Sequence, residues 1–159
     1  MFLDSTITDL TSALENAKVT LDTSKALYTD GMFMTSKVTR VPYLDLSKSY
    51  NCGNMFNGCT NLECIEGIKF PSKNYSNMFA NCTSLRSMTV ESGTIRATIS
   101  FGSSSLLLDI SIQSIIDGLA DLTGSTAQAI TFHKDIEAKL SDEQKAQITS
   151  KNWTLAFAS

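Results

Sequence analysis

A Met-Phe pair recurs along this chain at a constant interval. Met32-Phe33, Met55-Phe56 and Met78-Phe79 follow one another at steps of 23 residues, and Met1-Phe2 is a more distant candidate for a further copy. The eight residues that begin with the second pair read MFNGCTNL, and those that begin with the third read MFANCTSL. A repeat of this length, with its apolar positions in phase, cannot bury its own apolar edge and has to stack on a neighbouring copy. The sequence therefore predicts a solenoid of stacked repeats.

Apolar spacing after each pair predicts one strand per repeat. Apolar or small residues recur at the first, fourth and sixth positions of segments 62–67, 85–90 and 38–43, and more weakly over 14–21. Alternate side chains of a strand point to opposite faces, so this spacing lines the interior of the coil. A period in the low twenties is typical of leucine-rich repeats. The predicted fold class is α/β, a short leucine-rich-repeat solenoid of parallel strands with short helical turns.

The Met-Phe segments themselves are predicted to form a single helical turn on the convex side. Gly58 and Asn81 follow the second and third pairs, and both residue types tolerate the positive φ that the end of a helical turn requires. Leu27, Tyr50 and Tyr75 come shortly before successive pairs. We expect each of these three side chains to fill the coil from the convex side.

The equivalent positions of the repeats predict a structural core, formed by Phe33, Phe56, Phe79, Cys59 and Cys82. We expect the two cysteines to be buried free thiols that act as small apolar fillers. A disulfide between them would be within reach, although parallel Cβ vectors suit that bond poorly. Cys52 falls in a turn, and Cys64 is predicted to point outward from its strand. No C-x-x-C pair occurs and His133 is distant in sequence, so we expect no metal and no cofactor.

A different pattern begins near residue 96. Segments 98–101, 129–132 and 153–157 read as strands, and apolar residues at helical spacing over 112–122 predict a helix. Residues 1–101 are therefore assigned to the solenoid, and residues 102–159 to a capping segment of two helices and short strands that closes its C-terminal end.

Helix boundaries in the capping segment can be predicted from cap residues. Ser111 is the expected N-cap of the first helix and Gly124 its stop, and Ser141 opens the second helix with a capping box. No comparable cap precedes Asp4. We therefore expect the N-terminal end of the solenoid to be uncovered, and to meet a neighbouring subunit or domain there.

The words M-F-x-x-C-x-x-L-x-x-I and L-D-x-S-K resemble the BspA-like leucine-rich repeats, a cysteine-containing variety found in bacterial surface adhesins. The resemblance covers residues 1 to about 101 and is clearest over 32–90, with Ser36 where later repeats carry cysteine. The segments 114–124, 139–145 and 152–155 resemble a region that follows such repeats in proteins of gut bacteria and their phages. The combination implies a Bacteroidales-associated surface protein, or a phage or prophage tail component, whose task is recognition.

Composition excludes several other functions. The net charge is −3 with the charges scattered, and no basic patch with interleaved aromatics predicts nucleic-acid binding. No segment approaches the roughly 20 apolar residues that span a bilayer, so we expect no membrane insertion. The N-terminus lacks the basic and apolar regions of a signal peptide. The resemblance implies a location on a virion, or in the extracellular space or at a cell surface, and we expect no signal peptide in this chain.

Catalysis is not predicted. His133 has no nucleophile elbow or orienting acid beside it in sequence, and no phosphate-binding G-x-x-x-x-G-K loop occurs. Asp117 and Asp121 are best interpreted as a solvated helix face. Asp142-Glu143 opens a helix, where acidic side chains favour the helix dipole. We therefore expect a non-enzymatic protein.

Binding is predicted on the outward side chains of the strands, which form a continuous ladder on one face of a solenoid. The ladder residues are Lys18, Thr20, Arg40, Pro42, Cys64, Glu66, Ser87 and Thr89. The loops rich in Ser, Thr and Asn are equally good candidates, because loops on a rigid scaffold often carry recognition. The expected partner is a protein or glycan on a bacterial surface.

Three functional classes remain open from the sequence. The first is a phage or prophage tail-associated module that binds a bacterial surface receptor, which the missing signal peptide favours because virions assemble in the cytoplasm. The second is a fragment of a bacterial cell-surface BspA-like adhesin that binds host or microbial ligands. The third is a repeat that only spaces other domains.

Overall fold

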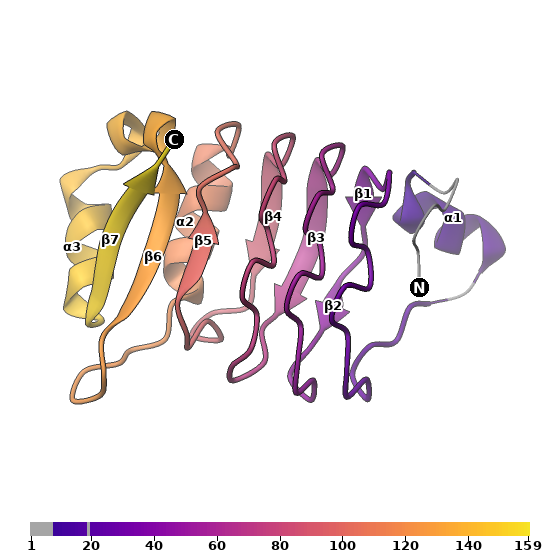
Figure 1. The fold of residues 1–159 in the computed structure, drawn as a ribbon, viewed down its shortest axis with the longest axis horizontal. Helices are drawn as coiled ribbons and strands as arrows, with labels where there is room; N and C mark the ends of the chain where they lie inside the picture. The colour runs from indigo at the N-terminus through magenta and orange to yellow at the C-terminus, as the bar shows by residue number, and fades with distance from the viewer. Residues whose placement is uncertain (1–7, 19) are drawn as a thin grey trace.

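The computed structural model describes residues 8–18 and 20–159, so Met1-Phe2 and Val19 lie outside the described residues. The chain is a mixed α/β domain with two sheets, each of parallel strands, and a few helices (Figure 1). The first sheet contains β1 (Arg40–Val41), β2 (Leu44–Asp45), β3 (Cys64–Lys69) and β4 (Ser87–Val90). The second contains β5 (Ile99–Phe101), β6 (Gln128–His133) and β7 (Trp153–Ala158). The helices are α1 (Leu10–Ala17), α2 (Asp109–Gly118), the 3₁₀ helix η1 (Lys134–Lys139) and α3 (Asp142–Ser150).

The strands predicted within the repeats are confirmed as parallel. β1 and β2 pair in succession with one edge of β3, and β4 pairs with its other edge. The strand expected over 38–43 is interrupted at Pro42, which has no backbone N–H to donate. Beyond this break the inside–outside alternation changes, so Tyr43 faces outward and is 48% exposed, whereas Leu44 is buried. The prediction that Tyr43 lines the interior is therefore wrong.

The first half of the segment read as a weak first strand, residues 14–17, belongs to α1, and Lys18 is the C-cap of this helix, so that prediction is wrong. Asp9 is the N-cap of this helix, and its carboxylate accepts the Ser12 amide hydrogen at 2.9 Å. Leu10 is 4% exposed and belongs to the core, and Leu14 packs against it one helical turn later. Asp9 also bridges to Arg40 of β1 in parallel orientation. The helix therefore covers the β1 edge, and the expectation of an uncovered N-terminal end is wrong for the described residues.

Phenylalanine rings form a column through the middle of the molecule. The centroids of Phe33 and Phe56 lie 5.2 Å apart with the planes 4° from parallel, and those of Phe56 and Phe79 lie 5.8 Å apart at 10°. The column then continues into the C-terminal part, with Phe79 stacked on Phe101 at 4.9 Å and Phe101 on Phe132 at 6.1 Å. All five side chains are at most 1% exposed. One apolar core therefore runs through both parts of the chain.

The Met-Phe segments are hydrogen-bonded turns, not helical turns. A residue with positive φ precedes each pair and another follows it, namely Gly31, Asn54 and Asn77 before and Thr35, Gly58 and Asn81 after. The amide of Phe33 donates to Met55 O at 2.9 Å, and that of Phe56 donates to Met78 O at 3.0 Å. Because these amides bond to the next repeat, they cannot close a helix within their own. The predicted helical turn is wrong, although the predicted positive φ at Gly58 and Asn81 is present.

Only one of the three side chains predicted to fill the coil does so. Tyr75 is 2% exposed, and its hydroxyl oxygen accepts the amide hydrogens of both residues in segment 96–97. Leu27 is 50% exposed and Tyr50 is 59% exposed, so the prediction for these two is wrong. Tyr75 aligns at 23 residues with the buried Cys52, whereas Leu27 and Tyr50 come two residues earlier in their repeats.

In the C-terminal part, strands lie on the side of the Met-Phe turns and helices lie on the side of the first sheet. β5, β6 and β7 pair in that order. β5 lies next to the last Met-Phe turn, because Phe101 stacks on Phe79. The helix α2 packs beside β4, where a further strand of the first sheet would otherwise lie, and α3 packs on β7 and α2. The predicted boundary after residue 101 falls between β5 and its partner β6.

The first residues of α2 bond to the edge of the first sheet. The helix begins at Asp109, and the hydroxyl oxygens of Ser111 and Ser114 accept the amide hydrogens of Met88 at 3.1 Å and Val90 at 2.9 Å. Ser111 is therefore inside the helix and buried, and the prediction that it is the N-cap is wrong. Its hydroxyl satisfies an edge-strand donor, which a sheet otherwise leaves unpaired.

The end of α2 also differs from the prediction. The helix ends at Gly118, well before Gly124. The Lys151 ammonium donates to the carbonyls of Ile116 at 3.1 Å, Asp117 at 3.5 Å and Leu119 at 2.9 Å. Burial lowers the pKa of Lys151. Three carbonyl groups near a helix end attract a cation, so Lys151 closes this terminus.

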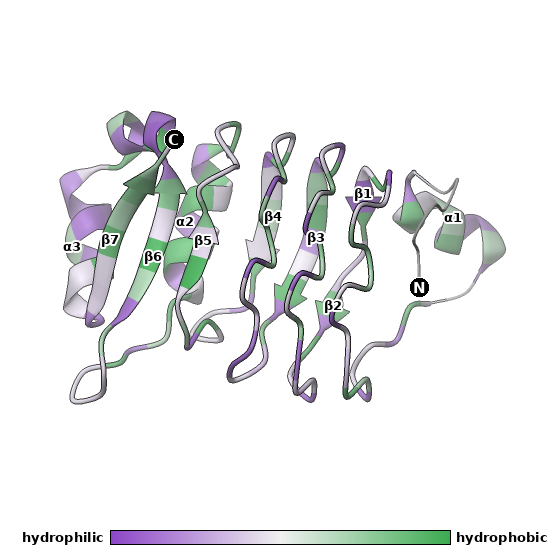
Figure 2. Ribbon diagram, in the orientation of Figure 1, coloured by the Kyte–Doolittle hydropathy of each residue, from purple (hydrophilic) through white to green (hydrophobic). Residues whose placement is uncertain are grey.

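The predicted second helix is confirmed with its capping box. The Ser141 hydroxyl accepts the Gln144 amide hydrogen at 3.2 Å, and the Gln144 side-chain oxygen accepts that of Ser141 at 3.0 Å. This helix, α3, is mainly hydrophilic in Figure 2, and Ile148 is its buried residue.

Candidate functional site

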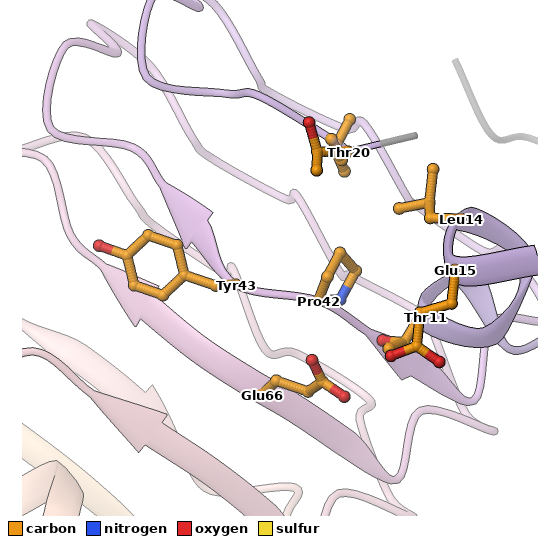
Figure 3. A pocket seen from close by; sticks show the side chains of 8 residues that line it. Thr11, Leu14, Glu15, Thr20, Pro42, Tyr43 and Glu66 are labelled. Carbon is orange, nitrogen blue, oxygen red and sulfur yellow. The ribbon is translucent and has the colours of Figure 1, made fainter. Parts of the chain in front are cut away.

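A hollow of about 360 Å³ opens between α1 and the outward face of the first sheet (Figure 3). The helix forms one wall, the segment that follows it forms another, and the break between β1 and β2 lies opposite. The lining residues are Thr11, Leu14, Glu15, Thr20, Leu21, Pro42, Tyr43 and Glu66. The hollow forms because a helix, α1, packs beside β1 in place of a further strand, and because Pro42 interrupts the sheet next to it.

An ion pair borders this hollow. Arg40 of β1 donates from Nε and from its terminal nitrogen to the same Glu66 oxygen, Oε1, at 2.9 and 2.7 Å. These hydrogen bonds and the charge of Glu66 raise the pKa of Arg40. The Arg40 side chain is 49% exposed and that of Glu66 is 32% exposed, so solvent screens the attraction. The pair fixes the orientation of the Glu66 carboxylate more than it stabilises the fold.

Tyr43 forms the aromatic wall of the hollow. Its hydroxyl donates to Glu91 Oε2 at 3.0 Å, and Lys69 pairs with the other oxygen of Glu91 at 3.0 Å. Burial of the ring and the bond to Glu91 raise the pKa of Tyr43. The ring lies across Gly67 of β3, because a Cβ at that glycine would come within 2.7 Å of the ring. Gly67 therefore leaves room for the ring, which a side chain at this position would displace.

Thr11 carries an unsatisfied polar atom beside the hollow. The residue is 7% exposed, and its Oγ1 is one of two buried side-chain oxygens or nitrogens that have no hydrogen-bond partner among the described residues; the other belongs to Thr23. Buried polar atoms are almost always paired. Because this oxygen has almost no accessible surface, it is not exposed to the hollow, although other atoms of Thr11 line it.

The predicted ladder exists across three of the four strands of the first sheet, β1, β3 and β4. Arg40, Cys64 and Ser87 are successive Cα partners on β1, β3 and β4. Glu66 and Thr89 are the next outward residues on β3 and β4, and both are exposed. Between Ile65 and Ile68 the register shifts, so Glu66 and Thr89 are not direct partners.

The remaining predicted residues are not rungs of the ladder. Lys18 is the exposed left-handed C-cap of α1, with φ 54°, and does not lie on a strand. Thr20 and Pro42 line the hollow together with Glu66. The prediction that Lys18 and Thr20 lie on a strand was wrong. The apolar spacing over residues 10–14 also fits a helix, and the helix that forms ends at Lys18. Sequence reasoning missed the contribution of α1, although Asp9 followed three residues later by Ser12 is an N-cap signal.

The four cysteines are free thiols. Cys59 donates to Phe33 O at 2.8 Å, and Cys82 donates to Phe56 O at 3.2 Å, each reaching into the preceding repeat. Burial raises the pKa of Cys52, Cys59 and Cys82, which makes these thiols poor nucleophiles. Cys64 is half-buried on the ladder. Within residues 8–18 and 20–159, no three potential metal ligands lie together.

His133 and the acidic pairs have structural partners. His133 Nδ1 accepts the Asp135 amide hydrogen at 3.2 Å and lies 3.4 Å from the Asp135 carboxylate. Asp117 accepts hydrogen bonds from Gln113 and Gln147. Asp121 bonds to the Thr123 amide, which with the Thr123 hydroxyl lowers the pKa of this carboxyl. Each of these groups is bonded within its own part of the fold.

None of the helices in the described part of the chain is long and apolar enough to cross a bilayer. No family model, curated protein or solved structure matches this chain. The resemblance to BspA-like repeats therefore stays a prediction from the sequence.

Proposed function

We propose that the chain is a short leucine-rich-repeat type solenoid that serves as a non-enzymatic recognition module. Its partner would be a receptor on a bacterial surface, and its setting the tail of a phage or prophage. The observation that supports this proposal best is the outward face of the first sheet, where the ladder from Arg40 to Ser87 borders a hollow of about 360 Å³.

Rigidity of the scaffold supports a role in recognition. The repeats are joined on one side by parallel strands and on the other by backbone bonds between successive Met-Phe turns. A surface whose side chains are already held in place loses little conformational entropy on binding. The fixed orientations of Glu66 and Tyr43, through Arg40 and Glu91, are examples at this face.

The phage setting and the bacterial partner come from the resemblance described above. They are tested by retention of the purified protein on cultured gut Bacteroidales. The informative variant exchanges the charges of the ion pair, Arg40→Glu with Glu66→Arg, because the pair can re-form while the pattern on the surface is reversed. A matched control exchanges two exposed charges of η1 at the far end, Lys134→Glu with Glu137→Lys.

The wild type and the η1 control should be retained on cells, and the variant of the ion pair should be retained less. Equal retention of all three proteins would exclude the first-sheet face as the contact surface. If no strain retains more wild-type protein than buffer alone does, the recognition proposal itself is contradicted.

A further inference from the structure

We propose that β7 is a dimerisation edge, at which a second copy of this chain pairs its own β7 in antiparallel orientation. The proposal is independent of the receptor proposed above. The observation that carries it is a six-residue, uncharged edge strand whose outer side has no partner in the described part of the chain. The apolar core reaches the surface at the same place.

The other ends of the two sheets are covered. In the first sheet, Ser111 and Ser114 of α2 accept amide hydrogens of β4, and Asp9 beside α1 bridges to β1. In the second sheet, β5 lies next to the last Met-Phe turn. β7 pairs with β6 alone, and residues 154–158 form no other backbone hydrogen bond to the described residues. The outer row of N–H and C=O groups on β7 is therefore available to a further strand.

The helix at this end of the molecule does not replace such a strand. α3 stands beside β7, opposite to the end formed by α1 (Figure 1). A helix bonds its backbone groups internally. The side-chain hydrogen bonds of α3 run to α2, to its own backbone and to its cap, and none of them reaches β7 within the described residues. This differs from α2, whose serines bond to β4.

The core ends at β7 without a polar cover. Ile130 and Phe132 of β6 are fully buried. Leu155 and Phe157, their Cα partners on β7, pack against the same core but are only half-buried. The terminal unit of a solenoid normally presents a polar outer side, because an apolar edge would otherwise meet water. A further strand beside β7 covers these two side chains as β7 covers those of β6.

The composition of β7 favours its own copy as the partner. Native proteins protect exposed sheet edges with charged residues, proline or bulges. The strand WTLAFA has no charge and no proline, and it pairs with β6 in continuous register. An uncharged edge meets an identical edge without like-charge repulsion, and it offers no charge that would select a different protein. Because both copies use the same edge, the contact closes at two chains.

Side-chain alternation fits this symmetry. Trp153, Leu155 and Phe157 face the core, so Thr154 and Ala156 lie on the opposite face of the sheet. Residues directly opposite each other in an antiparallel pair point to the same face. About a two-fold axis, the large residues of one β7 therefore meet the large residues of the other, and the small residues meet the small. Every such register gives the half-buried Leu155 and Phe157 an apolar neighbour.

Sedimentation equilibrium of the wild type tests the association. We expect a monomer–dimer equilibrium with a dissociation constant below about 1 mM. Hydrogen exchange at the same protein concentrations locates the contact. The β7 amides that point away from β6 should exchange more slowly as the dimer forms, whereas exchange in β1, near the opposite end of the molecule, should stay unchanged. A wild type that stays monomeric at about 1 mM would overturn the proposal.

Charge variants identify β7 as the strand that the two copies share. Thr154→Lys with Ala156→Lys places like charges opposite each other, and should weaken the dimer about five-fold or more. The same double substitution with glutamate should weaken it too. An equimolar mixture of the two variants should associate again, because lysine then faces glutamate. Recovery on mixing also shows that both variants are folded.

A matched control separates the contact from net charge. Thr60→Lys with Asn61→Lys adds the same charge in the exposed turn before β3, and should leave the dissociation constant unchanged. An equal loss in this control would assign the effect to net charge and overturn the proposal. So would a dimer that the β7 lysines do not weaken, or a mixture of the two β7 variants that stays monomeric.

Discussion

Gly118→Ala offers a sharp test of the packing between α2 and the first sheet. In an ordinary helix this substitution stabilises by roughly 0.5–1 kcal/mol, because alanine loses less backbone entropy. Here a Cβ would overlap the Cγ1 atom of Val90 and lie 2.9 Å from its Cβ and 3.4 Å from Ile95 Cδ1. Val90 lies on β4 and is 6% exposed, so it has little space into which to move. Overpacking of this kind costs about 1–3 kcal/mol.

We therefore expect Gly118→Ala to reduce the free energy of unfolding by about 2 kcal/mol, with the opposite sign to helix propensity. Urea unfolding followed by fluorescence of Trp153, which is buried and donates to Ala120 O, measures the change. The m-value should stay constant. Gly124→Ala, at a site with φ 80° and no atom within 4 Å, separates backbone strain from overpacking.

Relief of the overlap provides a second measurement. In the double variant with Val90→Ala, the nearest atom is removed, so the two effects should be less than additive by about 1 kcal/mol. A Gly118→Ala protein as stable as the wild type would refute the close approach of α2 to β4.

Three further predictions follow. Phe56→Ala removes the centre of three stacked rings and should destabilise by about 3–5 kcal/mol in urea unfolding; a loss below 1 kcal/mol would contradict the column. Tyr75→Phe leaves the two amides of segment 96–97 without their acceptor and should cost about 2 kcal/mol or more, and an unchanged thermal midpoint would count against that bond. The Ser12 amide lowers the pKa of Asp9, so this stabilisation is present above the unfolded pKa of about 3.9 and is lost as pH falls through the lower folded pKa. Asp9→Asn should flatten that acid dependence of the urea midpoint, whereas parallel curves would argue against it.

The repeating part of the fold could largely be predicted from the sequence. The 23-residue interval and the apolar spacing over 62–67 and 85–90 predict parallel strands, and β3 and β4 pair in parallel. Gly58 and Asn81 have the positive φ expected of them. These features depend on local backbone preferences and on one period, both of which can be read from the residues themselves.

The candidate site could be predicted only in part. Pro42 and Glu66 were expected on the outward face, and they line the hollow. Thr11 and Glu15 were missed because the apolar residues around Leu14, which are three and four positions apart, fit either a weak strand or a short helix. The choice between them depends on whether the apolar face of the segment packs beside β1, which is a tertiary contact.

Phase errors explain the misplaced aromatic residues. Tyr50 and Tyr75 both precede a Met-Phe pair, but they differ by two positions within the repeat. Both tyrosines lie outside the named strands, where two-residue alternation does not apply: Tyr50 is 59% exposed, whereas Cys52, two residues later and equivalent to Tyr75, is buried. The break at Pro42 has the same effect on Tyr43.

The sequence by itself determined that the repeats stack, because a 23-residue unit with one apolar edge can bury that edge only against its own copies. It also determined where α3 begins, since a capping box joins two residues only three positions apart. Only the tertiary structure decided how the two ends of the first sheet are closed and where the hollow lies. Those outcomes depend on α1 meeting β1 and on the serine hydroxyls of α2 meeting the edge of β4. Such contacts join segments that are distant in the chain, and no local pattern specifies them.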